Sequence, residues 1–471
     1  MNKINGYRGA LLGGAAWLAM TSAAHADELA ALKGQLESLQ SRIADLEQAP
    51  AAPSRAPAGA SLLTLDRGSQ LAFVAPTPAR DRANINDDAG FTIAVTPSAD
   101  LPAPVAEIAL YGYVKGDVIY DLDGNFNKYS FSMPGQDLTG EDDDGFVFLH
   151  ANQSRFGIKS KAATSVGEIR SRIEMDFYAA SERDDFGDAF LGLGQQSAIR
   201  LRHAFGEWDL TPNWTLLAGQ TDQTAMLGII GVTTVDNYGD AGINGGTRRS
   251  QLRITYHDGP LSWAVSMERP EEVSHTLIPD FASYVQYDLA GGHQFIVAGQ
   301  VSDLGKERSR DGDRHLGWVI GGGANINLAD IATLTAGAQY TRGLTDRWLN
   351  QLDTGRRVCD IDGENCALLR GYGVTAGLIF NVNETTSINV EGGYAENLNA
   401  DDGVIPLPET VWTVHGNLLW QPAKQLRLGW EVMWGREDFR EENNRCVMVG
   451  AGGDDCAVDS LRFQMGSWFY F

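Results

Sequence analysis

The chain has no apolar run long enough to cross a bilayer as a helix. A spanning helix needs about 20 consecutive apolar residues, and the run at residues 10–20 is shorter than that. Beyond it, Gly, Asp, Arg or Asn interrupts every apolar stretch. A membrane protein with this sequence would therefore cross the bilayer with strands.

Positive charge is also scarce. The chain carries 37 Lys and Arg against 61 Asp and Glu, a net charge of -24. Nucleic-acid binding requires a basic surface, because each phosphate is negative. This composition argues against nucleic acid as a partner.

Enzyme signatures are missing from the sequence. It contains no G-x-S-x-G, no H-E-x-x-H and no P-loop. His150, His203 and His415 have no neighbouring residue that would pair with them for catalysis. We therefore expect neither enzymatic activity nor a cofactor.

Cysteine is rare and falls in two local pairs, Cys359 with Cys366 and Cys446 with Cys456. In an exported protein each pair can close a small loop as a disulfide. The alternative is a zinc site, but such sites use closer C-x2-4-C spacing. We predict two loop disulfides and no metal site.

The amino end has the pattern of a secretory signal. Lys3 and Arg8 precede the apolar residues 10–20, and Ala24-His-Ala26 matches an A-x-A cleavage site. We therefore assign residues 1–26 to a signal peptide, which implies export.

Residues 27–48 have apolar side chains spaced alternately by three and four. They are Leu29, Leu32, Leu36, Leu39, Ile43 and Leu46. This spacing predicts an α-helical coiled coil, with a lone amphipathic helix as the alternative. About three heptads are marginally stable alone, so we expect the coiled coil to accompany another association.

Residues 49–106 begin with a run rich in Pro and Ala, which predicts a semi-extended linker. Two short apolar patches, residues 71–74 and 91–95, have no assignment from pattern alone. They would either dock at the periplasmic mouth of a barrel or pair briefly with a strand.

From residue 107 onward, apolar and polar side chains alternate with period two, as in strands with two different faces. The predicted strands are 107–120, 146–162, 166–180, 197–210, 214–221, 248–257, 261–269, 281–290, 292–302, 314–328, 332–343, 371–381, 384–396, 409–421, 424–436 and 459–471. This even number, sixteen, has connections that are alternately short and long, which is typical of outer-membrane barrels. We predict an all-β fold, a 16-stranded antiparallel transmembrane β-barrel over 107–471, rather than a soluble sandwich.

Four neighbouring strands carry arginine on the face that we expect to line the lumen. These arginines are Arg155, Arg170, Arg172, Arg200, Arg202, Arg249 and Arg253. His203 and Phe205 are expected on the opposite face, with Ile199 and Leu201. Arginine side chains bind carboxylates with two parallel hydrogen bonds, and rings of basic side chains favour anions.

The connection at residues 222–247 is long, rich in Gly and partly apolar. We expect it to fold into the barrel and narrow it, with Asp236 and Asp240 opposite the arginines. The alternative is that Glu168, Glu174 and Asp176 neutralise the arginines, which would then only stiffen the wall.

The chain resembles the DcaP-like family of trimeric outer-membrane porins. The resemblance rests on the heptad helix behind a signal peptide, residues 110–121 (LYGYVKGDVIYD), residues 154–159 (SRFGIK), Gly219-Gln-Thr221 and the terminal Phe471. It implies a homotrimer, a periplasmic coiled coil and passive uptake of small anions, especially dicarboxylates. In this family an aromatic residue usually follows Gly-Gln-Thr, whereas this chain has Asp222.

These patterns together predict a porin in the outer membrane of a Gram-negative bacterium, with its N-terminal extension in the periplasm. Its partners would be further copies of itself, outer-membrane lipid and lipopolysaccharide, and small anionic solutes. Two other functions stay open, namely a structural tether or adhesin that contacts the cell wall through the coiled coil, and a general non-selective porin.

Overall fold

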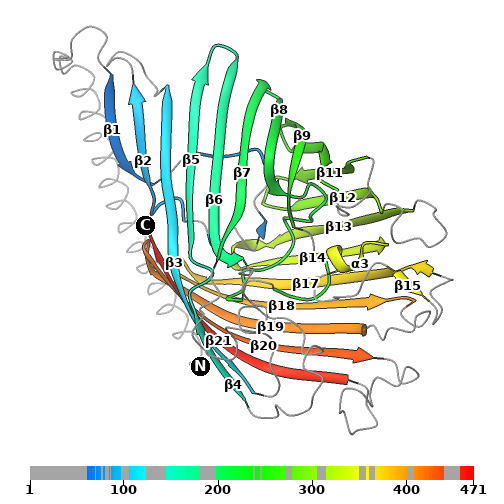
Figure 1. The fold of residues 1–471 in the computed structure, drawn as a ribbon. Helices are drawn as coiled ribbons and strands as arrows, with labels where there is room; N and C mark the ends of the chain where they lie inside the picture. Colours follow the sequence, from blue (N-terminus) through cyan, green and yellow to red (C-terminus); the bar gives the residue numbers. More distant parts are fainter. Residues whose placement is uncertain are drawn as a thin grey trace, which may run out of the picture. The chain divides into compact units, whose positions relative to one another are not determined.

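The protein is described here from a computed structural model, which shows a closed ring of antiparallel strands (Figure 1). The structure describes residues 61–68, 71–75, 78–79, 84, 86–96, 105–122, 145–179, 198–236, 239–243, 247–270, 278–304, 315–349, 357–359, 366–399, 408–439 and 457–471. The chain divides into two units, and every described strand belongs to the unit made of Leu62–Pro97 and Leu101–Phe471. The predicted signal peptide and coiled coil lie outside the described residues.

The ring has sixteen strands among the described residues, as the sequence predicts. They are β3 (Ala106–Asp121), β4 (Phe146–His150) together with β5 (Arg155–Thr164), β6 (Gly167–Ala179), β7 (Ala198–Thr211), β8 (Trp214–Asp222), β9 (Arg248–Asp258), β10 (Leu261–Glu268), β11 (Asp280–Asp288), β12 (Gln294–Asp303), β13 (Leu316–Leu328), β14 (Ala332–Arg342), β17 (Arg370–Asn383), β18 (Thr386–Asn397), β19 (Pro408–Ala423), β20 (Leu426–Phe439) and β21 (Ala457–Tyr470). Each strand pairs with the next, and β21 pairs with β3 to close the barrel.

One predicted strand is broken. The sequence suggests a continuous strand at 146–162, but β4 pairs with residues 117–121 of β3 and β5 with residues 106–113. At the break the backbone N–H of Lys115 donates a hydrogen bond to the Ser154 hydroxyl, 3.0 Å away. A side chain thus replaces a backbone partner where the ladder is interrupted.

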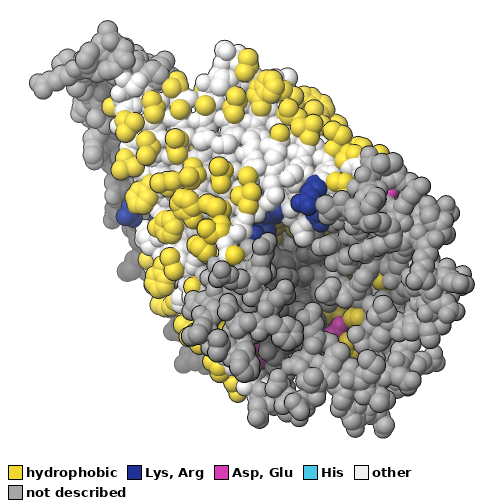
Figure 2. Space-filling view, viewed as in Figure 1, with side chains coloured by type: hydrophobic (Ala, Val, Ile, Leu, Met, Phe, Trp, Pro, Cys, Tyr) yellow, Lys and Arg dark blue, Asp and Glu magenta, His cyan; other side chains and the backbone are white. Residues whose placement is uncertain are grey.

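The two faces of the barrel differ as the alternation predicts. Outward positions carry exposed apolar side chains, such as Ile169 and Ile173 on β6, while Arg170 and Arg172 between them are buried. Figure 2 shows apolar side chains spread over the outer surface and a group of Lys and Arg beside a hollow. An outer apolar band of this kind faces lipid.

Tight turns join the strands at one end of the barrel, for example between β7 and β8 and between β19 and β20. In outer-membrane barrels the short turns face the periplasm. The connections at the other end are longer, and one of them contains the short helix α3 (Thr345–Trp348) and the hairpin of β15 (Arg357–Cys359) and β16 (Cys366–Leu368). A single 3-10 turn, η2 (Ala329–Ile331), joins β13 to β14.

Two further strands precede the ring, β1 (Leu62–Arg67) and β2 (Phe91–Thr96). β1 and β2 pair with each other in antiparallel fashion. On one edge of β3, β21 pairs with residues 113–121, and β2 continues along the same edge by pairing with residues 106–110. Part of the stretch that the sequence assigns to a linker therefore extends the sheet at the short-turn end.

Among the described residues, no helix is long and apolar enough to span a membrane.

Candidate functional site in the barrel lumen

The connection between β8 and β9, residues 222–247, is called the lumen loop here, because its described residues lie against the inner wall. Its apolar side chains Leu227, Ile230 and Ile243 are at most 3% exposed. They pack with inward residues of the wall, including Tyr284 and Val319. The predicted inward fold of this segment thus has a physical cause, since its apolar residues find a core inside the barrel.

Carboxylates of the wall hold the backbone of the lumen loop. Glu431 accepts hydrogen bonds from the N–H groups of Val235 and Asp236, at 2.7 and 3.3 Å. Glu391 accepts one from Val232 at 2.9 Å, and Glu268 accepts one from Thr224 at 2.8 Å. A buried carboxylate needs hydrogen-bond donors, and these backbone N–H groups supply them.

Inward glycines of the wall leave space for the lumen loop. A Cβ atom added at Gly337 would lie 2.6 Å from Ile243 Cδ1, and one added at Gly429 would lie 2.7 Å from Val235 Cγ2. At Gly393 an added Cβ would overlap the backbone of Ala241. Side chains at these positions would therefore push the loop into the lumen.

Asp236 and Asp240 lie on the lumen loop but turn away from the open lumen. The Asp240 carboxylate accepts a hydrogen bond from Thr375 of β17 and is fully buried. Asp236 is 4% exposed, and its carboxylate accepts a hydrogen bond from the backbone N–H of Gly239 at 3.2 Å. β17 stands across the ring from β7, so Asp240 lies on the wall opposite β7. Asp236 lies near β20 and β3, because its backbone N–H donates to Glu431 and the neighbouring Val235 carbonyl accepts a hydrogen bond from Lys115.

Four of the predicted arginines form one network on β5, β6 and β7. The arginine cluster comprises Arg155, Arg172, Arg200 and Arg202 with the carboxylates of Glu174 and Asp176. Glu174 lies 2.6 Å from Arg172, 2.8 Å from Arg202 and 3.4 Å from Arg155. Asp176 lies 2.6 Å from Arg200 and 2.8 Å from Arg202.

Within the arginine cluster as described, guanidinium groups outnumber carboxylates. Four guanidinium groups meet two carboxylates, which leaves an excess of two positive charges within this described network. The Arg200 side chain is 35% exposed, whereas that of Arg202 is 2% exposed. The pairing with acidic residues that the sequence leaves open as an alternative therefore occurs at Glu174 and Asp176.

A β-bulge shapes this cluster. The register between β6 and β7 shifts between Glu174 and Met175, so Arg202 and His203 are both buried inside the barrel. The expected outward position of His203 and Phe205 is wrong, because an extra residue in one strand reverses the alternation beyond it. His203 is 3% exposed and Phe205 is 5% exposed.

The other three predicted arginines have different surroundings. Arg170 contacts three carboxylates, those of Glu168, Glu207 and Asp209, nearer the short-turn end. Arg253 donates a hydrogen bond to the backbone carbonyl of Asp222 at 2.7 Å.

Arg249 donates hydrogen bonds to Thr247 and to the carbonyl of Pro270. Arg249 and Arg253 thus hold segments at the two ends of the lumen loop.

Tyr111 of β3 belongs to the site and was not among the predicted residues. Its hydroxyl donates a hydrogen bond to Glu174 at 2.7 Å and accepts one from Arg172 Nε at 2.8 Å. The alternation of β3 places it inward, but its position beside Arg172 depends on the register between strands.

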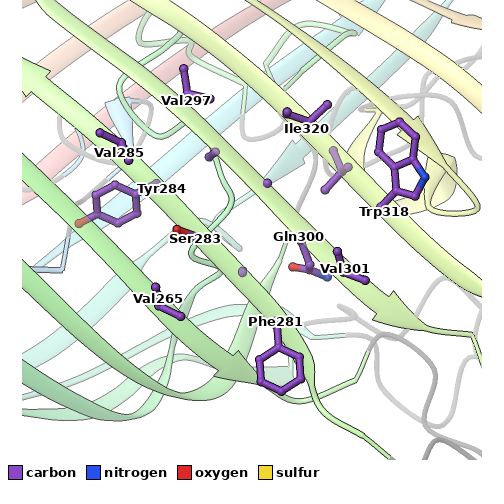
Figure 3. Close-up of a pocket in the computed structure, with 14 residues that line it drawn as sticks. Val265, Phe281, Ser283, Tyr284, Val285, Val297, Gln300, Val301, Trp318 and Ile320 are labelled. Atoms are coloured by element: carbon purple, nitrogen blue, oxygen red, sulfur yellow. The ribbon is translucent and has the colours of Figure 1, made fainter.

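A separate hollow of about 630 Å³ lies on β10 to β13 (Figure 3). Outward apolar side chains such as Val265, Phe281 and Val297 line it around the small Ser283 and Gly299. It belongs to the apolar outer band and is therefore no candidate for an anion path.

Within the described residues, no group of three or more His, Cys, Asp or Glu could hold a metal ion. The described side chains of the site offer charge and hydrogen bonds.

The barrel has the fold of outer-membrane porins, as comparison with known structures shows. The outer-membrane channel DcaP of Acinetobacter baumannii is 20% identical, with a TM-score of 0.62 over 78% of this chain and 97% of that one. An anion-selective porin from Comamonas acidovorans is 14% identical, with a TM-score of 0.51 over 78% of this chain and 100% of that one. OmpF of Salmonella typhi, in a complex with daunomycin, is 13% identical, with a TM-score of 0.52 over 78% of this chain and 98% of that one.

The resemblance to DcaP-like porins expected from the sequence is confirmed in the fold. No protein-family model matches the chain, and no curated protein sequence is similar to it.

Proposed function

We propose that this barrel conducts small anions, and dicarboxylates in particular, along the arginine cluster. The observation that carries the proposal is the arginine cluster, whose ion pairs join four guanidinium groups to two carboxylates. Basic side chains along a pore concentrate anions and repel cations. Arg200, whose side chain is 35% exposed, is the proposed solute contact. Arg155, Arg172 and Arg202 are at most 5% exposed and supply positive charge behind it.

The rest of the barrel wall supports this proposal. Its carboxylates Glu268, Glu391 and Glu431 accept hydrogen bonds from the lumen loop, and the loop lies over them. Each is at most 3% exposed. The lumen loop separates these carboxylates from a passing ion, whereas the Arg200 side chain is 35% exposed, and the energy between two charges falls with their distance.

The chemistry of the cluster also suits carboxylates. Glu174 and Asp176 are already bound there by several guanidinium groups at hydrogen-bonding distance. A solute with two carboxylates offers the same groups in a mobile form, and such charge-assisted hydrogen bonds are strong. Arg170 is left out of the proposed path because it sits among three carboxylates.

The DcaP and Comamonas structures are an outer-membrane channel and an anion-selective porin, and we extend both properties to this chain. We also propose that the functional unit is a homotrimer in the outer membrane with the N-terminal extension in the periplasm. This arrangement follows from the resemblance and from the predicted coiled coil.

The direct test is electrical. Purified full-length protein in planar bilayers should give a reversal potential of the anion-selective sign in a KCl gradient. Succinate should reduce the chloride current at lower concentration than acetate does. Cation preference without a succinate effect would exclude the proposal, and equal permeation of both ions would favour a general porin. A barrel without conductance would favour a structural tether.

A further inference from the structure

The connection between β1 and β2 enters the barrel. Its described residues 71–75, 78–79 and 86–90 are called the strap here. The N–H groups of Val74 and Ala75 donate hydrogen bonds to the Glu207 carboxylate of β7, at 2.9 and 2.7 Å. The ring of Phe73 meets that of Phe205 edge to face, with centroids 5.5 Å apart. Since Phe205 and Glu207 face inward, this part of the strap lies inside the barrel.

The strap then touches the lumen loop and the far wall. The N–H of Ala79 donates a hydrogen bond to the carbonyl of Gly228 at 2.7 Å. Asn86 donates a hydrogen bond to the carbonyl of Lys424, in the tight turn between β19 and β20. Ala89 is buried in a cluster that includes Trp468. Described points of the strap thus contact β7, the lumen loop and β21 in turn.

One ion pair joins the strap to β5, close to the arginine cluster. Lys159 of β5 binds the Asp87 carboxylate at 2.6 Å. Lys159 pairs directly opposite Arg172 in the register of β5 and β6, and its ammonium lies 4.9 Å from the centre of the Tyr111 ring. Lys159 therefore lies next to the arginine cluster, on the side nearer the short turns, with Tyr111 and Arg172 as its neighbours.

The two partners differ in exposure. The Lys159 side chain is 4% exposed and that of Asp87 is 48% exposed. A buried ammonium requires an anion, and Asp87 supplies it from a side chain that solvent still reaches. The strap therefore supplies a carboxylate, accessible to solvent, to a buried cation of the wall.

We propose that Lys159 is an additional anion-binding residue of the solute path, and that Asp87 of the strap occupies it when no solute is bound. A solute carboxylate that leaves the arginine cluster would displace Asp87 and bind Lys159 next. The strap thereby acts as an internal competitor at the short-turn end of the channel. This inference rests on the proposed anion function and deepens it.

The test uses full-length protein in planar bilayers, with succinate as the probe. Asp87→Asn removes the competing charge and should lower the succinate concentration that halves the chloride current by roughly fivefold, a coupling typical of linked sites. Adding Lys159→Gln to Asp87→Asn should abolish this gain. Asp88→Asn is the matched control, because neighbouring Asp88 pairs with Lys424 and both side chains are more than 60% exposed.

The outcomes separate the two proposals. If the unmodified protein shows neither anion preference nor succinate block, the proposed function fails. Suppose that it shows both, but that the succinate concentration that halves the chloride current is the same for Asp87→Asn as for Asp88→Asn, or is higher. Then the proposed role of Lys159 and Asp87 is wrong, and the proposed anion channel is unaffected. A gain in Asp87→Asn that survives Lys159→Gln would likewise overturn the assignment of Lys159.

Discussion

The guanidinium of Arg462 binds both oxygens of the Asp121 carboxylate, at 2.6 and 2.8 Å, across the seam where the last strand meets the first. The two residues are direct partners in the register of β21 and β3, and both side chains are fully buried. The sequence shows the final strand as an alternating run that ends on Phe471. This ion pair on the inner face of the barrel joins that strand to β3.

Breaking this pair should weaken closure of the barrel. Arg462→Gln leaves the Asp121 carboxylate buried without its guanidinium partner, and loss of one partner of a buried pair costs about 3 kcal/mol. We expect a lower unfolding midpoint in urea, measured by tryptophan fluorescence of detergent-folded protein. The double variant Arg462→Met with Asp121→Leu removes both charges and should recover part of the loss. A double variant less stable than the single one would contradict this account.

The cysteine pair of the β15–β16 hairpin gives a second prediction. Cys359 and Cys366 are direct partners in its register, and the described residues include no free cysteine. We expect an alkylating reagent to label Cys359 and Cys366 only after reduction, as read by mass spectrometry of the peptides. Labelling of either residue in unreduced, freshly purified protein would exclude this disulfide. Cys446 and Cys456 lie outside the described residues, and their pairing stays a prediction.

Arg200 should influence ion selectivity more than an arginine outside the lumen. Arg200→Gln removes a partly exposed charge near the path, worth roughly 1 kcal/mol in water, or about a fivefold change in the anion-to-cation permeability ratio. Arg436→Gln is a matched control, because Arg436 is 36% exposed and binds Asp438 at 2.8 Å on the outer face of β20. Reversal potentials in a KCl gradient measure both. Equal effects of the two variants would refute a lumenal role for Arg200.

The fold was predictable because one physical rule repeats along the chain. Alternation of side chains gives the first strand as 107–120 and the last as 459–471, and the structure has Ala106–Asp121 and Ala457–Tyr470. Each strand of such a barrel presents one apolar face to lipid. The alternation of apolar and polar residues can therefore be recognised in each strand without knowledge of the neighbouring strands.

The site was less predictable because it depends on contacts between distant residues. The bulge beside Arg202 arises from the pairing of β6 with β7, and the pattern of β7 alone gives no sign of it. The strap reaches Glu207 across 132 positions of sequence. The inward carboxylates could be recognised from alternation, but their use as acceptors for the lumen loop depends on where that loop lies.

The glycines beneath the lumen loop give the last prediction. Gly337→Val should displace the loop, because the new Cβ would meet Ile243 at 2.6 Å and Ile230 at 3.3 Å. Overpacking of this kind typically costs 1–3 kcal/mol, roughly, and the loop can yield more readily than the paired strands. The displaced loop would move into the lumen, so we expect lower or noisier single-channel conductance in planar bilayers, with the barrel still folded by circular dichroism.

Gly416→Val is the control for this change, since no atom lies within 4 Å of its added Cβ. It introduces the same side chain into the same barrel and should leave conductance unaltered. If Gly337→Val folds and conducts as Gly416→Val does, the loop is not seated on the wall through this glycine. If both variants alter conductance equally, the effect comes from valine in the sheet, and the loop has no special dependence on Gly337.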